Sequence, residues 1–168
     1  HELKTPIAVA YAANDALLGC FLPCHACIDN TIHTYAGIQL RLACADIMRQ
    51  QGCPEPTGRA KLTPAFNLPS RFVLHTVGPI IDGIPTEEEG ALLASCYRSC
   101  LELADKNRLT SVAFCCISTG EFRFPQDEAA RIAVAAVRRY KETTQSRIKV
   151  IFNVFKDNDL ESYRKLLG

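Results

Sequence analysis

The sequence lacks three features that would place it in a specialised class of protein. It has no block of basic residues and a formal net charge of +1, which argues against a nucleic-acid binder that relies on bulk electrostatics. No apolar run approaches the roughly 20 residues that cross a bilayer, and the N-terminus shows no signal-peptide pattern. We therefore expect a cytoplasmic protein with no membrane partner and no direct contact with nucleic acid.

The composition is that of a globular protein with a sizeable core. Of the 168 residues, 48% are hydrophobic and 22% are charged. This length suits one domain, and we expect residues 1–168 to form it. The chain begins with His1 rather than Met, so we also expect that upstream sequence is missing.

Apolar periodicity predicts strands that alternate with helices along the chain. We expect helices over residues 28–51, 87–107, 127–144 and 159–168, and strands over 7–14, within 59–71, and over 72–77, 111–117 and 149–155. This alternation favours an α/β fold, a three-layer α/β/α sandwich around a mixed or mostly parallel sheet. Ligands bind beyond the carboxyl ends of strands in such sheets, so the loops after the strands at 7–14 and 111–117 are the candidate binding regions.

The second of these loops reads "STGEFRFP", residues 118–125. Small residues let backbone N–H groups converge on an anion, and Gly120 permits the close approach or positive φ that such a turn needs. Phe122 and Phe124 alternate, as they would if they laid an aromatic face beside a sugar or base. The alternative is an ordinary strand-to-helix turn with two aromatic residues in the core.

The first loop carries an unusual cluster of metal-binding residue types. "CFLPCHAC", residues 20–27, holds three cysteines and a histidine. Zinc prefers thiolate and imidazole ligands in tetrahedral geometry. If Cys20, Cys24, His25 and Cys27 all bind, the site is closed and structural. Three ligands, Cys20, His25 and Cys27, leave the fourth position open, as in a catalytic site. The alternatives without metal are a reactive thiol paired with His25, or inert cysteines.

The remaining cysteines have a simpler explanation. The total of nine is odd, so the chain cannot pair all of them internally. Cys96 and Cys100 lie four residues apart in a predicted helix, and Cys115 and Cys116 lie in an apolar run. We expect these four to be buried thiols that act as small hydrophobic residues.

Asp29 and Asn30 follow the cysteine cluster, where the next helix is predicted to begin. Asp29 is suited either to cap that helix or to act as a carboxylate beside a metal, taking a proton from water or a sugar hydroxyl. His33 lies four residues further on, on the same helical face as Asp29. It has a structural interpretation, a hydrogen bond to Asp29.

Three phrases resemble the macrodomain family of ADP-ribose-binding α/β/α proteins. They are "AAN" before the first loop, "CPEPTGRAKLTPAFNLPSRFVLHTVGP" at residues 53–79, and "ISTGEFRFP" at residues 117–125. In place of the glycine-rich first loop of ordinary macrodomains this chain has "GCFLPCHACID", which resembles the zinc-dependent branch. Tyr11 stands where the family phrase has Asn, and the segment that reads adenine would lie upstream of His1.

The resemblance implies a set of site residues. Zn²⁺ would be held by Cys20, His25 and Cys27, with Cys24 left out. Asp29, Asn14 and Asn30 would be catalytic. The ADP-ribose ligand would contact Asn14 and the residues Ile28, Asp29, Asn30, Ser118, Thr119, Gly120, Glu121 and Phe122, with residues 118–122 around the diphosphate and Phe122 over the distal ribose.

The resemblance also implies an activity. It is that of a hydrolase that removes ADP-ribose from modified protein side chains, with zinc at the distal ribose. Its partners would be an ADP-ribosylated protein, the ADP-ribose product and a sirtuin-type ADP-ribosyltransferase in the same pathway. One alternative is a reader that binds ADP-ribosylated protein without cleaving it and whose zinc is structural. Another is a thiol-based hydrolase or redox sensor that uses Cys24 or Cys27 with His25.

Overall fold

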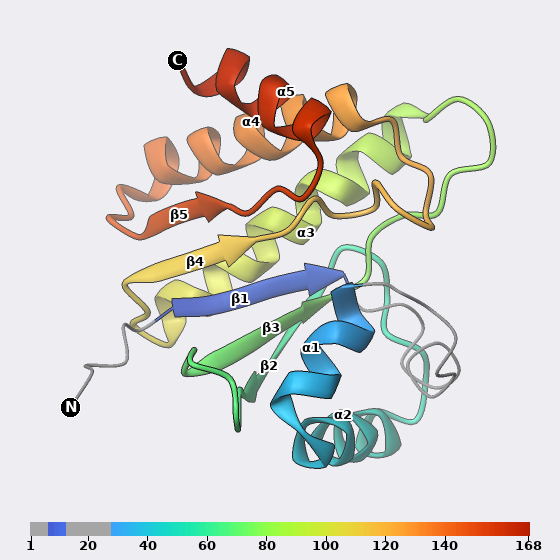
Figure 1. Ribbon diagram of the computed structural model, residues 1–168, viewed down its shortest axis with the longest axis vertical. Coiled ribbons are helices and arrows are strands. Elements are labelled where there is room, and N and C mark those ends of the chain that lie inside the picture. Colours follow the sequence, from blue (N-terminus) through green and yellow to red (C-terminus); the bar gives the residue numbers. More distant parts are fainter. Residues whose placement is uncertain (1–6, 13–27) are drawn as a thin grey trace.

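The computed structural model describes the backbone of residues 7–12 and the whole of residues 28–168 (Figure 1). In this part of the chain one five-stranded sheet has the order β2-β3-β1-β4-β5. The strands are β1 (Ile7–Ala12), β2 (Ala60–Pro64), β3 (Phe72–Thr76), β4 (Ser111–Phe114) and β5 (Lys149–Phe152).

The sheet is mixed, as the sequence predicts. β1 runs parallel to β3 and to β4, β4 runs parallel to β5, and β2 is antiparallel to β3. Ala10 of β1 pairs with Leu74 on one side and with Phe114 on the other. The carboxyl ends of the four parallel strands therefore meet at one edge of the sheet, and the loops that follow them leave from that edge.

Helices cover both faces of the sheet. They are α1 (Ile28–Ala36), α2 (Ile38–Gln51), α3 (Glu87–Lys106), α4 (Gln126–Thr144) and α5 (Asp157–Leu167). Figure 1 shows α1 and α2 in front of the sheet and α3 behind it. The predicted three-layer α/β/α sandwich is confirmed. None of the helices in the described ranges is long and apolar enough to cross a membrane.

The prediction of one continuous helix over residues 28–51 is wrong. Gly37 separates α1 from α2 with a φ of 88°, a left-handed conformation that side chains disfavour. Asn67 fills the space beside it, since a Cβ added to Gly37 would lie 2.8 Å from Asn67 Nδ2. The Asn67 N–H also donates to the carbonyl of Ala36 at 3.3 Å. A tertiary contact therefore fixes the break, although the apolar spacing continues through it.

The strands β4 and β5 end earlier than predicted. β4 ends at Phe114 and β5 at Phe152, rather than at residues 117 and 155. The Asn153 N–H donates to the carbonyl of Phe114 at 2.7 Å, and beyond this hydrogen bond the two strands are no longer paired. The apolar run through residue 117 continues because Ile117 is a core residue outside the strand.

An aromatic ladder joins the helices to the sheet. Ring centroids are 5.0 Å apart for Tyr97 and Phe114, 6.4 Å for Phe114 and Phe152, and 4.8 Å for Phe152 and Tyr163. Phe114 and Phe152 are cross-strand partners, so their rings lie on one face of the sheet. α3 and α5 therefore pack on that face, which fixes β4 and the start of the loop that follows it.

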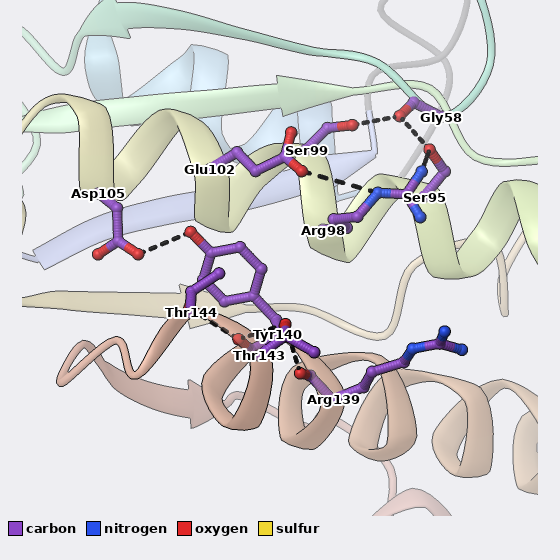
Figure 2. Close-up of polar contacts among 10 residues, drawn as sticks. All are labelled: Gly58, Ser95, Arg98, Ser99, Glu102, Asp105, Arg139, Tyr140, Thr143 and Thr144. Carbon is purple, nitrogen blue, oxygen red and sulfur yellow. Dashed lines mark hydrogen bonds and ion pairs between the residues drawn. The ribbon is translucent and has the colours of Figure 1, made fainter.

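Polar contacts tie α3 to its neighbours (Figure 2). The hydroxyls of Ser95 and Ser99 donate to the carbonyl of Gly58 at 3.1 and 2.7 Å, which anchors the loop before β2. At the other end of α3, the Tyr140 hydroxyl of α4 donates to Asp105 at 2.6 Å. Burial, followed by this hydrogen bond, raises the pKa of Tyr140, so the hydroxyl keeps its proton.

The expectation of buried cysteines outside the first loop is confirmed for three of the four. Cys96 and Cys100 are fully buried and Cys115 is buried, whereas Cys116 is half-buried. Burial, the largest cause, raises the pKa of Cys116 to about 12. Thiols of this kind pack as small apolar groups and are not nucleophiles at neutral pH.

Candidate active site

The loops after β3 and β4 contact each other at the carboxyl edge of the sheet. The Ile81 N–H donates to the carbonyl of Phe122 at 2.9 Å. Gly78 lies against the second loop, since a Cβ added there would be 2.0 Å from Ser118 Oγ and 2.9 Å from Ile117 Cγ2. A glycine at this position therefore allows the two loops to approach closely.

Residues 118–122 form a compact turn. Ser118 has a φ of 65°, its carbonyl accepts the Phe124 N–H at 2.9 Å, and the Gly120 carbonyl accepts the Arg123 N–H at 3.0 Å. Within the described residues, the N–H groups of residues 120, 121 and 122 donate to no protein acceptor, and the buried Ser118 hydroxyl has no hydrogen-bond partner. The turn thus offers several donors, which suits an anion.

The two aromatic residues of this loop have different surroundings. Phe124 is 2% exposed and belongs to the hydrophobic core, so the core alternative holds for it. Phe122 is also buried, at 8% exposed. Thr119 is half-buried, and Gly120 and Glu121 are exposed. Contact of these residues with a ligand stays a prediction.

The predicted residues Ile28, Asp29 and Asn30 form the first turn of α1. Figure 1 shows that α1 begins beside the carboxyl end of β1, and the loop after β4 leaves from the same edge. Ile28 is 41% exposed, Asp29 only 2%, and Asn30 is half-buried. Burying a carboxylate is costly unless it is paired or hydrogen-bonded, so the groups around Asp29 must compensate its charge.

His33 and Asp29 do lie on one face of α1. His33 Nε2 is 3.6 Å from Asp29 Oδ1, which is longer than a normal hydrogen bond. Burial, aided by the positive charge of Arg41, lowers the pKa of His33 to about 4. His33 is therefore neutral at pH 7, and its contact with Asp29 is between an imidazole and a carboxylate rather than an ion pair.

A group of polar side chains behind Asp29 was not predicted from the sequence. His75 Nε2 is 2.8 Å from the Thr63 hydroxyl, and the Cys44 sulfur is 3.8 Å from His75 Nδ1. Burial, followed by the charge of His33, lowers the pKa of His75 to about 3. Burial, followed by the charge of Asp29, raises the pKa of Cys44 to about 12. We call Asp29, His33, Cys44, Thr63 and His75 the buried polar cluster.

Arg41 of α2 was also missed. Its Nη2 donates to Asn30 Oδ1 at 3.3 Å, which links α2 to the first turn of α1. No signal in the sequence indicates this contact, because a continuous helix would hold the two residues far apart.

The predicted metal ligands and the predicted ribose contact lie outside the described residues. These are Cys20, His25, Cys27 and Asn14, together with Cys24. Among residues 28–168, there is no group of three or more His, Cys, Asp or Glu side chains that could hold a metal ion. The zinc site therefore stays a prediction for residues 20–27.

The sequence of this chain is similar to that of known proteins. A "Protein-ADP-ribose hydrolase" of Treponema medium is 58% identical over 161 residues, which is 96% of this chain and 62% of that protein. The chain spans about three fifths of the length of the curated relatives it matches.

Two solved structures are similar over nearly the whole chain. The Oceanobacillus iheyensis macrodomain with ADP has a TM-score of 0.85 and 35% identity, covering 98% of this chain and 84% of that one. The Trypanosoma brucei macrodomain in complex with ADP-ribose has a TM-score of 0.81 and 36% identity, covering 96% of this chain and 63% of that one. Residues 10–133 match the Macro domain family, and the chain belongs to it.

Proposed function

We propose that this chain removes ADP-ribose from modified protein side chains by hydrolysing the bond at C1″ of the distal ribose. The observation that carries the proposal is that a donor-rich turn at residues 118–122 and the buried carboxylate of Asp29 lie at the same edge of the sheet. The name of the Treponema medium relative and the ADP-ribose complex of the Trypanosoma brucei macrodomain support the same reaction and ligand.

The turn at residues 118–122 is suited to the diphosphate. Backbone N–H groups that have no protein acceptor within the described residues can donate to phosphate oxygens without losing an internal hydrogen bond. Binding at this turn holds the distal ribose in place, and such positioning contributes several kcal/mol to a reaction in favourable cases.

Phe155 is suited to stack on the adenine. It follows β5, its side chain is 97% exposed, and the carboxyl end of β5 lies at the same edge as that of β4. An exposed aromatic ring can stack on a base, a contact worth about 1–3 kcal/mol. The sequence does not single out this residue, because the apolar run through residue 155 is typical of a continuing strand.

The first turn of α1 is suited to the distal ribose. The reaction passes through oxocarbenium-like charge, so the useful groups hold the sugar and deliver water. Asp29 orients or deprotonates the attacking water at its carboxylate oxygens, and Asn30 and Asn14 hold ribose hydroxyls. Asp29 is buried, so bulk water does not screen its charge.

The donor set of the first loop fits zinc. Cys20 and Cys27 supply thiolates and His25 an imidazole, which are the ligands that Zn²⁺ prefers, with one position left for substrate or water. α1 begins at Ile28, directly after Cys27, so these ligands adjoin Asp29 in the chain. Zinc bound there would supply Lewis acidity at a ribose hydroxyl or at water.

The neutral histidines favour an acceptor linked through oxygen, such as Asp, Glu or Ser. The pKa of His33 is lowered to about 4 and that of His75 to about 3, so neither is an acid at pH 7. A nitrogen leaving group, as from Arg, would need such an acid, whereas the carboxylate of Asp or Glu departs as a stable anion without one. An ADP-ribosyltransferase must supply this substrate, and a sirtuin-type enzyme remains our expectation for it.

The test is release of free ADP-ribose from an automodified acceptor protein, measured before and after verified removal of zinc by a chelator. We expect activity that disappears with the metal and returns when zinc is added. Full activity without metal would refute the role of zinc. Tight binding of ADP-ribose with no release from any linkage would instead make the chain a reader.

The ligand set is tested by two matched variants. We expect Cys20→Ser to lose metal and activity, and Cys24→Ser to keep both. Loss of metal in both variants would indicate the closed, four-ligand site. Alkylation that abolishes activity while the metal content stays intact would support the thiol-based alternative.

A further inference from the structure

Arg41 is a charged side chain that the proposed reaction does not yet use. It lies on α2, outside the predicted site residues, and donates from Nη2 to Asn30 Oδ1 at 3.3 Å. Its charge also acts on His33 and on Cys44, two members of the buried polar cluster around Asp29. Arg41 therefore lies next to both Asn30 and the side chains that surround Asp29.

The break at Gly37 creates this contact. The two residues are 11 positions apart, and a continuous helix would separate them by about 16 Å along its axis, beyond the reach of the two side chains. Gly37, with a φ of 88° and Asn67 against it, turns α2 back toward the first turn of α1. The left-handed conformation of Gly37 thus allows Arg41 to come within hydrogen-bond distance of Asn30.

The contact also fixes the orientation of the Asn30 amide. A guanidinium only donates hydrogen bonds, so the amide oxygen must face Arg41. The NH₂ group is then directed to the opposite side of the amide plane. A side-chain amide without such a partner can rotate and exchange its donor and acceptor ends.

We propose that Arg41 is a positioning residue that orients the Asn30 amide so that its NH₂ donates to a hydroxyl of the distal ribose. This inference rests on the proposed function, because it needs the sugar to lie at the first turn of α1. It assigns to α2 a role toward the substrate, in addition to the contact of Cys44 with His75.

The experiment is a double-mutant cycle on the zinc-loaded chain with Arg41→Met, Asn30→Ala and the double variant. Methionine is unbranched and has nearly the helix propensity of arginine, and it removes the donors and the charge. The readouts are the affinity for ADP-ribose and kcat/KM for release from a modified acceptor. We expect each single variant to lose about tenfold, and the double variant to lose no more than Asn30→Ala alone.

Arg49→Met is the matched control on the same helix. Arg49 is 74% exposed at its side chain and pairs only with Asp46 on the surface among the described contacts, so we expect wild-type affinity and turnover. Arg41→Lys, which keeps the charge and a donor, should restore part of the loss. It also replaces Arg41→Met in the cycle if that variant fails to fold.

Losses that add in the double variant would overturn the proposal, because a purely structural effect of Arg41 would not depend on Asn30. Wild-type affinity and turnover in Arg41→Met would overturn it as well. If the wild-type chain binds ADP-ribose but does not cleave it from a modified acceptor, hydrolysis is excluded as the function. The cycle is then evaluated from the affinities alone. A wild-type chain that does not bind ADP-ribose overturns both.

Discussion

Replacing Gly78 with alanine tests the contact between the loops that follow β3 and β4 at the edge of the sheet. The new Cβ would lie 2.0 Å from Ser118 Oγ, 2.9 Å from Ile117 Cγ2 and 3.3 Å from Ser118 Cβ. An ordinary contact needs at least 3.4 Å, so the Ser118 oxygen must move by about 1.4 Å. Rotation of the serine side chain does not relieve the other two contacts. Overpacking of this kind costs roughly 1–3 kcal/mol of stability.

The displacement falls on the turn that we assign to the diphosphate. A misplacement of about 1 Å can cost about 100-fold in a positioned reaction, and we expect a loss of ADP-ribose affinity of about tenfold or more. Calorimetric titration measures the affinity, and urea unfolding measures the stability. Gly90→Ala is the control, because its nearest contact is an ordinary 3.6 Å and alanine favours helix α3 by up to about 1 kcal/mol. Wild-type affinity in Gly78→Ala would refute our assignment of the turn.

Three further predictions concern stability and the adenine contact. The lowered pKa values of His33 (about 4) and His75 (about 3) mean that at pH 5 these two side chains are protonated in the unfolded chain but mostly neutral in the folded one. The free energy of unfolding should therefore fall by about 2 kcal/mol for each histidine between pH 7 and 5. A free energy of unfolding, measured in urea, that stays constant over this range would contradict the prediction. Thr86→Ala removes the capping box with Glu89 at the start of α3 and should cost about 1 kcal/mol in the same assay, whereas an unchanged midpoint would show that the cap is unimportant. Phe155→Ala should leave stability within about 0.5 kcal/mol but weaken ADP-ribose binding at least fivefold, and unchanged affinity would exclude adenine stacking.

The order of helices and strands could be predicted from the sequence because each buried element repeats apolar residues with its own period. The same reasoning predicted the mixed sheet and the start of α3 at residue 87, both of which are confirmed. It also placed Asp29 in a first helical turn and, among four cysteines expected to be buried, three that are in the core. These features depend on local patterns or on burial alone.

The break at Gly37 could not be predicted in the same way. Leu40 continues the apolar spacing of Ile32 and Ala36, while the left-handed glycine is held by Asn67, which lies 30 residues further along the chain. The contact between Arg41 and Asn30 depends on that break, so it was missed too. The histidine of β3 reads as one polar residue in an apolar strand, and only the packing of Thr63 and Cys44 around it reveals the buried polar cluster.

The central claim is that one bound ADP-ribose contacts both the turn at residues 118–122 and the first turn of α1 at this edge of the sheet. A crystal structure of the chain with zinc and ADP-ribose tests it most directly. We predict the diphosphate in the turn at residues 118–122, on the N–H groups of residues 120–122, and the distal ribose against Asp29 and Asn30, beside zinc held by Cys20, His25 and Cys27. A ligand bound elsewhere, or zinc bound away from the ribose, would contradict the account.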